Sequence, residues 1–179
     1  MRAGRAPVHI VFAGLPGVGK TTIARELARR LGAVYLRIDS LEQALARSGA
    51  VVLSELGPGG YHAAAAVAVD NLLNGVSVVT DSVNPWPITR RLWQDASDRG
   101  KAVCVGIEVV CSNVGEHRRR VESRAPDILD CILPDWEAVQ SRQYESWDEA
   151  DLRLDTAFLD VQQAVEEALA YIGNAHGAL

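Results

Sequence analysis

The chain has 179 residues, of which 18 are Lys or Arg and 23 are Asp or Glu, so its formal net charge is −5. With 48% hydrophobic and 23% charged residues, the composition is that of a globular protein and excludes wholesale disorder. The charge balance gives no overall attraction to nucleic acid, and no apolar run reaches the roughly 18 residues that cross a bilayer. The three cysteines lack metal-site spacing. We expect a single cytoplasmic domain over residues 1–179.

Short apolar runs alternate with segments of helical periodicity along the chain. The apolar runs predict strands at 8–15, 33–38, 76–80, 102–110 and 152–154. The periodic segments predict helices at 21–31, 41–48, 61–73, 87–99, 114–124, 135–147 and 158–172. Strands that are apolar on both faces and are separated by helices are typical of a parallel sheet. The pattern therefore predicts a three-layer α/β fold, with a five-stranded parallel sheet and helices on both faces.

The turn after the first predicted strand carries a phosphate-binding sequence. Residues 14–21 read Gly-Leu-Pro-Gly-Val-Gly-Lys-Thr and match the pattern G-x-x-x-x-G-K-[ST]. The glycines allow a tight turn whose N–H groups point at a phosphate, and the following helix adds positive potential at its N-terminus. Lys20 would reach the β- and γ-phosphates, and the Thr21 hydroxyl would coordinate Mg²⁺. The expected nucleotide-binding residues here are Gly14, Pro16, Gly17, Val18, Gly19, Lys20, Thr21 and Thr22.

This loop resembles that of the P-loop small-kinase branch, and the order of the elements agrees with that family along nearly the whole chain. The branch includes adenylate, shikimate and gluconate kinases, chloramphenicol phosphotransferase, zeta toxins and polynucleotide kinase, and its members are often called AAA family ATPases. The resemblance implies the P-loop NTPase fold, ATP with Mg²⁺, and phosphoryl transfer to a bound acceptor. A GTPase is disfavoured, because the sequence has no N-K-x-D motif and no D-x-x-G after the third strand.

Two aspartates follow predicted strands, at the edge of a parallel sheet where ligands bind. Asp39 resembles the carboxylate that contacts the acceptor hydroxyl in several small-molecule kinases and serves as general base, although it could instead cap the helix predicted from Leu41. Asp81 resembles the Walker B aspartate that holds the water shell of Mg²⁺, with a polar turn residue as the alternative. The stretch from Asp81 to Asn84 resembles the Asp-x-x-Asn of polynucleotide and tRNA kinases, which implies that Asn84 contacts acceptor or phosphate.

A very basic helix is predicted over 114–124, and a proline-bounded irregular stretch follows it. Arg120 and Arg124 are four residues apart and should share a helix face. They resemble the Arg-x-x-x-Arg at the start of the adenylate-kinase lid, which implies that one guanidinium stacks on adenine and the other meets the transferred phosphate. The lid would span about 120–135. A solvated basic face is the alternative, and it is favoured for two neighbouring residues, Arg118 and Arg119.

Weaker signals surround these motifs. Asp155 and Thr156 follow the fifth predicted strand, where the resemblance implies that the chain passes the adenine, so a backbone contact with the nucleotide is plausible there. Three polar residues could bind the acceptor, although surface solvation is favoured for them: Arg37, Arg47 and Glu55. Three aromatic residues could wall an acceptor pocket, although packing is favoured for them: Tyr61, Trp86 and Trp93.

Together these residues predict an ATP-dependent phosphotransferase that phosphorylates a hydroxyl group of a small molecule, such as a metabolite or an antibiotic. Thr21 and Asp81 would hold Mg²⁺. The residues expected to act in the transfer itself are Lys20, Asp39, Arg120 and Arg124. Two alternatives stay open, a polynucleotide or tRNA kinase and an ATP-binding regulatory switch. The net charge weighs against a nucleic-acid partner, and the sequence leaves the acceptor, the oligomeric state and the choice of purine triphosphate open.

Overall fold

The computed structural model describes residues 6–176, so residues 1–5 and 177–179 of the predicted domain lie outside the described part. The strands are β1 (Val8–Ala13), β2 (Val34–Arg37), β3 (Val78–Asp81), β4 (Val103–Val110) and β5 (Leu152–Asp155). The helices are α1 (Lys20–Leu31), α2 (Ile38–Arg47), the 3-10 turn η1 (Leu53–Glu55), α3 (Gly59–Leu73), α4 (Pro87–Arg99), α5 (Val114–Ser123), α6 (Trp136–Gln140) and α7 (Val161–His176). The predicted strands are thus confirmed within a few residues at each end.

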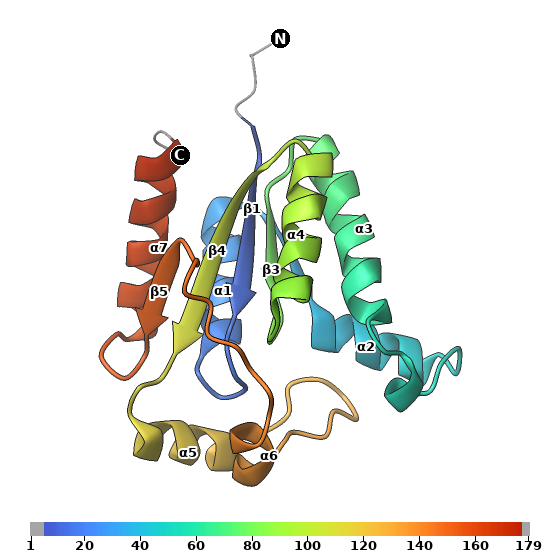
Figure 1. Ribbon diagram of the computed structural model, residues 1–179, viewed down its shortest axis with the longest axis vertical. Coiled ribbons are helices and arrows are strands. Elements are labelled where there is room, and N and C mark those ends of the chain that lie inside the picture. The colour runs from blue at the N-terminus through green and yellow to red at the C-terminus, as the bar shows by residue number, and fades with distance from the viewer. Residues whose placement is uncertain (1–5, 177–179) are drawn as a thin grey trace.

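The strands form one parallel sheet in the order β2-β3-β1-β4-β5, so β1 lies at its centre (Figure 1). All the strands point toward the end of the molecule that carries α5 and α6. The register aligns Phe12 of β1 with Asp81 of β3, and Asp81 in turn with Arg37 of β2. The ends of three strands, and the polar side chains there, therefore meet beside the loop that follows β1.

Both faces of the sheet are covered by helices, as the apolar strands predict. Ile10 and Phe12 pack in one core cluster with residues of α1 and α7. Val11, which points to the opposite face, packs in a second cluster with Trp93 of α4 and with residues of α3. Because successive residues of a strand face opposite sides, a strand buried on both sides is apolar throughout. The three-layer arrangement predicted from the sequence is correct.

One predicted helix is wrong over about half of its length. The prediction covers 135–147, but α6 ends at Gln140, and residues 141–151 cross the sheet as an irregular strap (Figure 1). Glu108 of β4 accepts hydrogen bonds from the Tyr144 hydroxyl (2.7 Å) and from the Trp147 N–H (2.9 Å). The Trp147 ring also lies against Gly106, where any Cβ would collide with it. These contacts with β4 override the local helical pattern.

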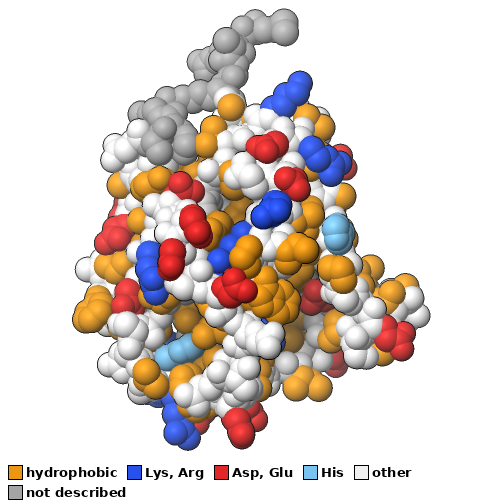
Figure 2. Space-filling model, viewed as in Figure 1, with side chains coloured by type: hydrophobic (Ala, Val, Ile, Leu, Met, Phe, Trp, Pro, Cys, Tyr) orange, Lys and Arg blue, Asp and Glu red, His pale blue; other side chains and the backbone are white. Residues whose placement is uncertain are grey.

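The surface carries charges of both signs. Acidic and basic side chains are mixed over the face that Figure 2 shows, with no large area of a single sign. A mixed surface of this kind does not produce the strong field that attracts a polyanion over long range. Within residues 6–176, every helix is too short or too polar to cross a membrane.

His9 is a buried polar residue in the middle of the apolar core. Its Nδ1 lies 2.7 Å from the Ser97 hydroxyl, and its ring meets the Trp93 ring edge-on with the centroids 5.8 Å apart. Burial lowers the pKa of His9 to about 4. The folded protein therefore holds a neutral imidazole at neutral pH, at the end of β1 remote from the loop that follows this strand.

We expect the free energy of unfolding to fall as the pH drops from about 6.5 to about 4, by up to about 3 kcal/mol from His9 alone. In the unfolded chain the His9 imidazole binds a proton in this pH range, whereas in the folded protein, where its pKa is lowered, it does not. Urea denaturation at several pH values, on the protein and on His9→Gln, measures the effect. The variant should be less stable at pH 7 but show a flatter dependence on pH, and equal slopes would contradict the prediction.

Candidate active site

The loop between β1 and α1 has a conformation that requires glycine. Gly14 and Gly17 have φ angles of 141° and 87°, in the region that residues with a side chain rarely adopt. A Cβ on Gly14 would collide with the Val109 carbonyl oxygen, and one on Gly17 would lie 2.5 Å from the Val121 side chain. The glycines predicted from the sequence thus let the loop pack closely on β4 and α5 while it turns into α1.

Three elements of the fold hold this loop from outside. The His117 Nε2 of α5 donates to the Pro16 carbonyl (2.9 Å), and the Thr156 hydroxyl donates to the Val18 carbonyl (2.8 Å). The Gly14 N–H donates to the carbonyl of Val83, after β3 (3.1 Å). Two carbonyl groups of the loop are therefore fixed by partners from α5 and from the β5–α7 connection.

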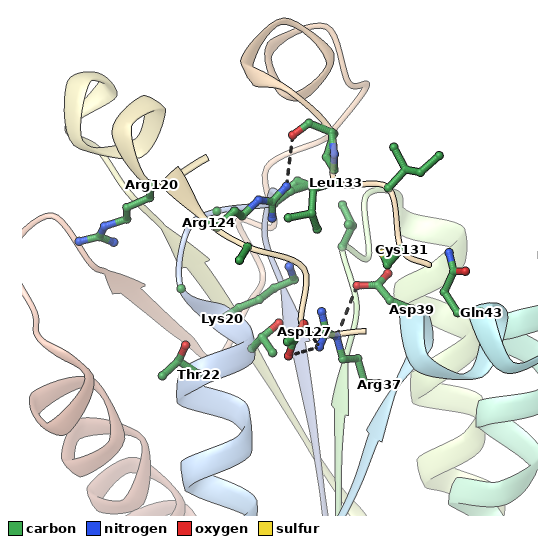
Figure 3. Close-up of a pocket in the computed structure, with 18 of the residues that line it drawn as sticks. Lys20, Thr22, Arg37, Asp39, Gln43, Arg120, Arg124, Asp127, Cys131 and Leu133 are labelled. Atoms are coloured by element: carbon green, nitrogen blue, oxygen red, sulfur yellow. Dashed lines mark hydrogen bonds and ion pairs between the residues drawn. The ribbon is translucent and has the colours of Figure 1, made fainter. Parts of the chain in front are cut away.

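A cleft of about 480 Å³ opens beside the loop, between α2 and the segment that follows α5 (Figure 3). Six of its lining residues come from the loop and the start of α1: Pro16, Gly17, Gly19, Lys20, Thr21 and Thr22. Three come from α2: Asp39, Glu42 and Gln43. Gly14 and Val18, also predicted to bind nucleotide, do not line it, and the Val18 side chain packs in the core. The structure thus places the predicted phosphate loop opposite the predicted general base.

Lys20 and Asp81 are both buried; Lys20 lines the cleft, whereas Asp81 lies behind its lining. Burial lowers the pKa of the Lys20 ammonium, although the charges of Asp81 and Asp39 act in the opposite direction. Asp81 is the last residue of β3, and its Oδ2 accepts a hydrogen bond from the Tyr35 hydroxyl (2.8 Å). Burial and the charge of Asp81 both raise the pKa of Tyr35, which keeps the donating proton in place. Asp81 is thus a buried carboxylate near Lys20, at the end of a strand. It is not a polar residue of a surface turn.

Thr21 and Asp81 provide the oxygen ligands that Mg²⁺ prefers, a hydroxyl and a carboxylate. Thr21 follows Lys20 in the first turn of α1 and lines the cleft. Within residues 6–176, no group of three or more His, Cys, Asp and Glu side chains is placed to hold a metal ion. Mg²⁺ commonly takes only one or two protein ligands and completes its shell with water and phosphate oxygens, so these two residues fit it.

Asp39 lies within α2, at the second residue of the helix, and the alternative that it caps this helix is wrong. The helix begins at Ile38, three residues earlier than predicted, and Arg37 occupies the capping position without a side-chain hydrogen bond. The Asp39 side chain is 54% exposed and lies 3.5 Å from the Arg37 guanidinium. One turn along the helix, burial and the charge of Asp39 raise the pKa of Glu42 to about 7. Asp39 and Glu42 therefore present adjacent carboxyl groups to the cleft.

Arg120 and Arg124 line the cleft, but they do not share the expected helix face, because α5 ends at Ser123. Arg120 donates to the hydroxyl and the carbonyl of Thr156 (2.8 and 3.0 Å) and pairs with Glu116 at 2.7 Å. Its guanidinium points away from Lys20, whereas Arg124 extends over the cleft and donates to the Pro134 carbonyl (Figure 3). The other two arginines of the helix are exposed and paired with glutamates, in agreement with solvation: Arg118 and Arg119.

The two residues predicted after β5 use their side chains to hold the chain itself. Asp155 accepts hydrogen bonds from the N–H groups of Ser112 and Ala157, both at 3.0 Å. Thr156 joins the phosphate loop to Arg120, as described above. Neither residue lines the cleft, so a contact of this connection with a nucleotide would come from its backbone.

Asn84 and the aromatic candidates lie outside the lining of the cleft. Asn84 has a φ angle of 50° and is fully buried, and its side-chain amide has no hydrogen-bond partner among residues 6–176. Its N–H donates to the Tyr61 hydroxyl (3.1 Å), and Tyr61 packs on Trp93. Tyr61, Trp86 and Trp93 do not line the cleft. Tyr61 and Trp93 pack as favoured, whereas Trp86 is 42% exposed.

Several residues of the site have no local sequence signal. They are Tyr35, His117, Asp127 and Arg142. Each becomes a site residue only through its place in the fold; His117 and its partner Pro16, for example, are 101 residues apart. Glu42 and Gln43 were also missed. Glu42 and Gln43 could have been found from their helical spacing to Asp39, because residues three and four apart share a face. The predicted start of the helix at Leu41 left Asp39 outside the helix.

A comparison with known proteins gives the same type of fold. The family model described as "AAA domain" matches residues 10–146. The chain is 29% identical over 174 residues to a shikimate kinase of Corynebacterium diphtheriae, covering 95% of this chain and 97% of the relative. The APS kinase of Mycobacterium tuberculosis in complex with AMPPNP and APS is similar in structure, with a TM-score of 0.67 and 19% sequence identity. The match covers 94% of this chain and 98% of the APS kinase. A gluconokinase of Sinorhizobium meliloti is also similar in structure, with a TM-score of 0.64 and 18% sequence identity. The match covers 96% of this chain and 95% of the gluconokinase.

Thr156→Val tests the attachment of the phosphate loop. We expect the free energy of unfolding to fall by about 1–3 kcal/mol, because the buried Val18 carbonyl and the Arg120 guanidinium lose a partner. Binding of ATP with Mg²⁺ should weaken too, since the loop loses a fixed point. Urea denaturation and calorimetry measure the two effects. Thr156→Ser keeps the hydroxyl and should stay close to the unmodified protein, so equal losses in both variants would contradict this role.

Proposed function

We propose that this chain, which belongs to the AAA domain family, is an ATP-dependent kinase of the P-loop small-kinase branch that acts on a hydroxyl group of a small molecule. Its similarity to a shikimate kinase and to a gluconokinase supports the proposal. One observation carries the proposal. A single cleft joins the phosphate loop with Lys20 to the Asp39 carboxylate on α2. A donor of phosphoryl groups and an acceptor can therefore be held side by side, which is the main requirement of this reaction.

The loop side of the cleft binds the nucleotide in this proposal. The glycine-rich backbone and the N-terminus of α1 surround the phosphates, and Lys20 neutralises their oxygens. Thr21 and Asp81 are the residues that would hold Mg²⁺. ATP supplies the γ-phosphoryl group, and Mg²⁺ lowers its negative charge. Arg124 extends over the same space and stabilises the charge of the group in transfer, whereas Arg120 holds the side of the cleft formed by Thr156.

The α2 side binds the acceptor. Asp39 accepts the hydroxyl proton as the acceptor oxygen forms its bond to phosphorus, and the bond from phosphorus to the β,γ-bridging oxygen breaks, so that ADP leaves. Glu42 and Gln43 face the same space and hold further hydroxyl or amine groups of the acceptor. Shikimate and gluconate, the compounds in the names of two similar proteins, are the first acceptors to test.

The proposal is tested by the transfer of label from radioactive ATP to a panel of acceptors. The panel holds shikimate, gluconate, APS and a 5′-hydroxyl oligonucleotide. We expect a labelled product from a small hydroxyl compound that depends on Mg²⁺ and on Lys20. Label on the oligonucleotide alone would instead favour the polynucleotide-kinase alternative, and no labelled acceptor from a folded, ATP-binding protein would contradict the proposal.

Asp39→Asn separates a kinase from a switch protein. We expect turnover to fall by about 10²–10⁴-fold, because the amide cannot accept the hydroxyl proton. Nucleotide affinity, measured by calorimetry, should change by less than about threefold, since Asp39 lies on the acceptor side of the cleft.

Asp70→Asn is the matched control, because Asp70 is exposed on α3 and lies outside the cleft. This control should keep full turnover. If Asp39→Asn keeps full turnover as well, the assignment of the base is wrong.

A further inference from the structure

Arg37 occupies the junction between β2, α2 and the segment over the cleft. It is the last residue of β2, and its side chain is only 10% exposed. Its Nη1 donates to both carboxylate oxygens of Asp127, at 2.9 and 2.8 Å. Its Nε lies 3.5 Å from Asp39 Oδ2 (Figure 3). One guanidinium therefore connects the proposed base with a carboxylate that lies 90 residues away along the chain.

Asp127 belongs to residues 126–134, the tip of the lid predicted over about 120–135. This segment lines the cleft and is called the lid from here on. Apolar side chains of the lid are largely exposed, with Leu129 at 68% and Ile132 at 92%, so burial of apolar surface does little to hold it. Charged contacts hold it instead. Arg25 of α1 also donates to Asp127, at 2.9 Å. Although its partial burial would raise the pKa of Asp127, the bonds from Arg25 and Arg37 keep it below the ordinary value.

The geometry at Asp39 differs from that at Asp127. Arg37 makes hydrogen bonds to Asp127, but its distance to Asp39 is that of an ion pair, and its buried Nε has no hydrogen-bond partner among residues 6–176. The bond to Asp127 thus fixes the plane of the guanidinium while the Asp39 oxygens stay able to accept a proton. Without Asp127, the planar fork would be free to take Asp39 as a bidentate partner, which is the arrangement that arginine and carboxylate prefer.

Resting on the kinase function proposed above, we propose that Arg37 is a positioning residue that couples closure of the lid to the state of Asp39. With the lid closed, Arg37 is held by Asp127 and orients Asp39 toward the acceptor. With the lid open, Arg37 turns to make bidentate hydrogen bonds to Asp39 and blocks the proton acceptor. The protein therefore has an active base only when the lid covers the cleft and excludes water, which protects ATP from hydrolysis.

Two arginines with one shared partner provide a matched test. Arg25 and Arg37 both bind Asp127, but only Arg37 contacts Asp39. Hydrogen exchange of residues 126–134 measures the lid, and transfer from ATP to gluconate or shikimate, whichever the panel shows to be used, measures the reaction. We expect Arg25→Ala to raise lid exchange only slightly, because both hydrogen bonds from Arg37 to Asp127 remain, and Arg37→Ala to raise it more. Arg37→Ala should also lower kcat at least tenfold with little change in KM for ATP, whereas Arg25→Ala should change kcat less than threefold.

Asp127→Asn, alone and combined with each arginine variant, forms double-mutant cycles that test the coupling. On its own it should raise lid exchange and lower kcat, because it releases Arg37 to Asp39. In the Arg37→Ala background it should lower kcat no further, whereas in the Arg25→Ala background its full effect should remain. Equal kcat losses in the two arginine variants, or additive losses with Arg37→Ala, would overturn the coupling. If the unmodified protein transfers no phosphoryl group, the kinase function itself is overturned. If the unmodified protein is active but Arg37→Ala and Asp127→Asn leave lid exchange unchanged, only the coupling is overturned.

Discussion

A phosphate loop can bind an anion only if its backbone N–H groups point inward, and its carbonyl groups must then find partners elsewhere. The fold meets this constraint through His117 and Thr156, whose side chains donate hydrogen bonds to the carbonyl oxygens of Pro16 and Val18. These two partners come from α5 and from the β5–α7 connection. Because β4 and β5 run parallel to β1, the elements that follow them lie at the same end of the sheet as the loop, so the loop depends on the whole fold and not on its glycines alone.

The cleft combines two environments. At the loop end, Lys20 and Asp81 are buried and charges interact strongly, as binding of a triphosphate requires. At the α2 end, Asp39 is half-exposed and lies beside Arg37 at the end of β2 and Glu42 of α2. Apart from Arg37, the residues that would recognise an acceptor lie on α2 and on the lid, which can change without loss of the sheet.

The fold and the phosphate loop follow from the sequence because their signals are local. Apolar runs mark the strands, and Gly14 to Thr21 carry a pattern whose chemistry is fixed by spacing. The errors arise where distant contacts decide. Residues 141–147 are not helical because Tyr144 and Trp147 bind Glu108, and the Arg120 guanidinium binds Thr156, 36 residues away. Asp127 and His117 gain their roles from partners about 100 residues away, which no short pattern records.

The strap over β4 has a consequence for protein engineering. Upstream of the lid, α5 is tied to the phosphate loop through His117, and downstream the strap is tied to β4 through Tyr144 and Trp147. Residues 125–140 thus form a segment between two anchored borders. A chimaera that exchanges this segment and keeps both borders would replace the lid while Arg124 and the acceptor residues of α2 are preserved, whereas a junction placed inside the strap would remove the contact of Trp147 with Gly106.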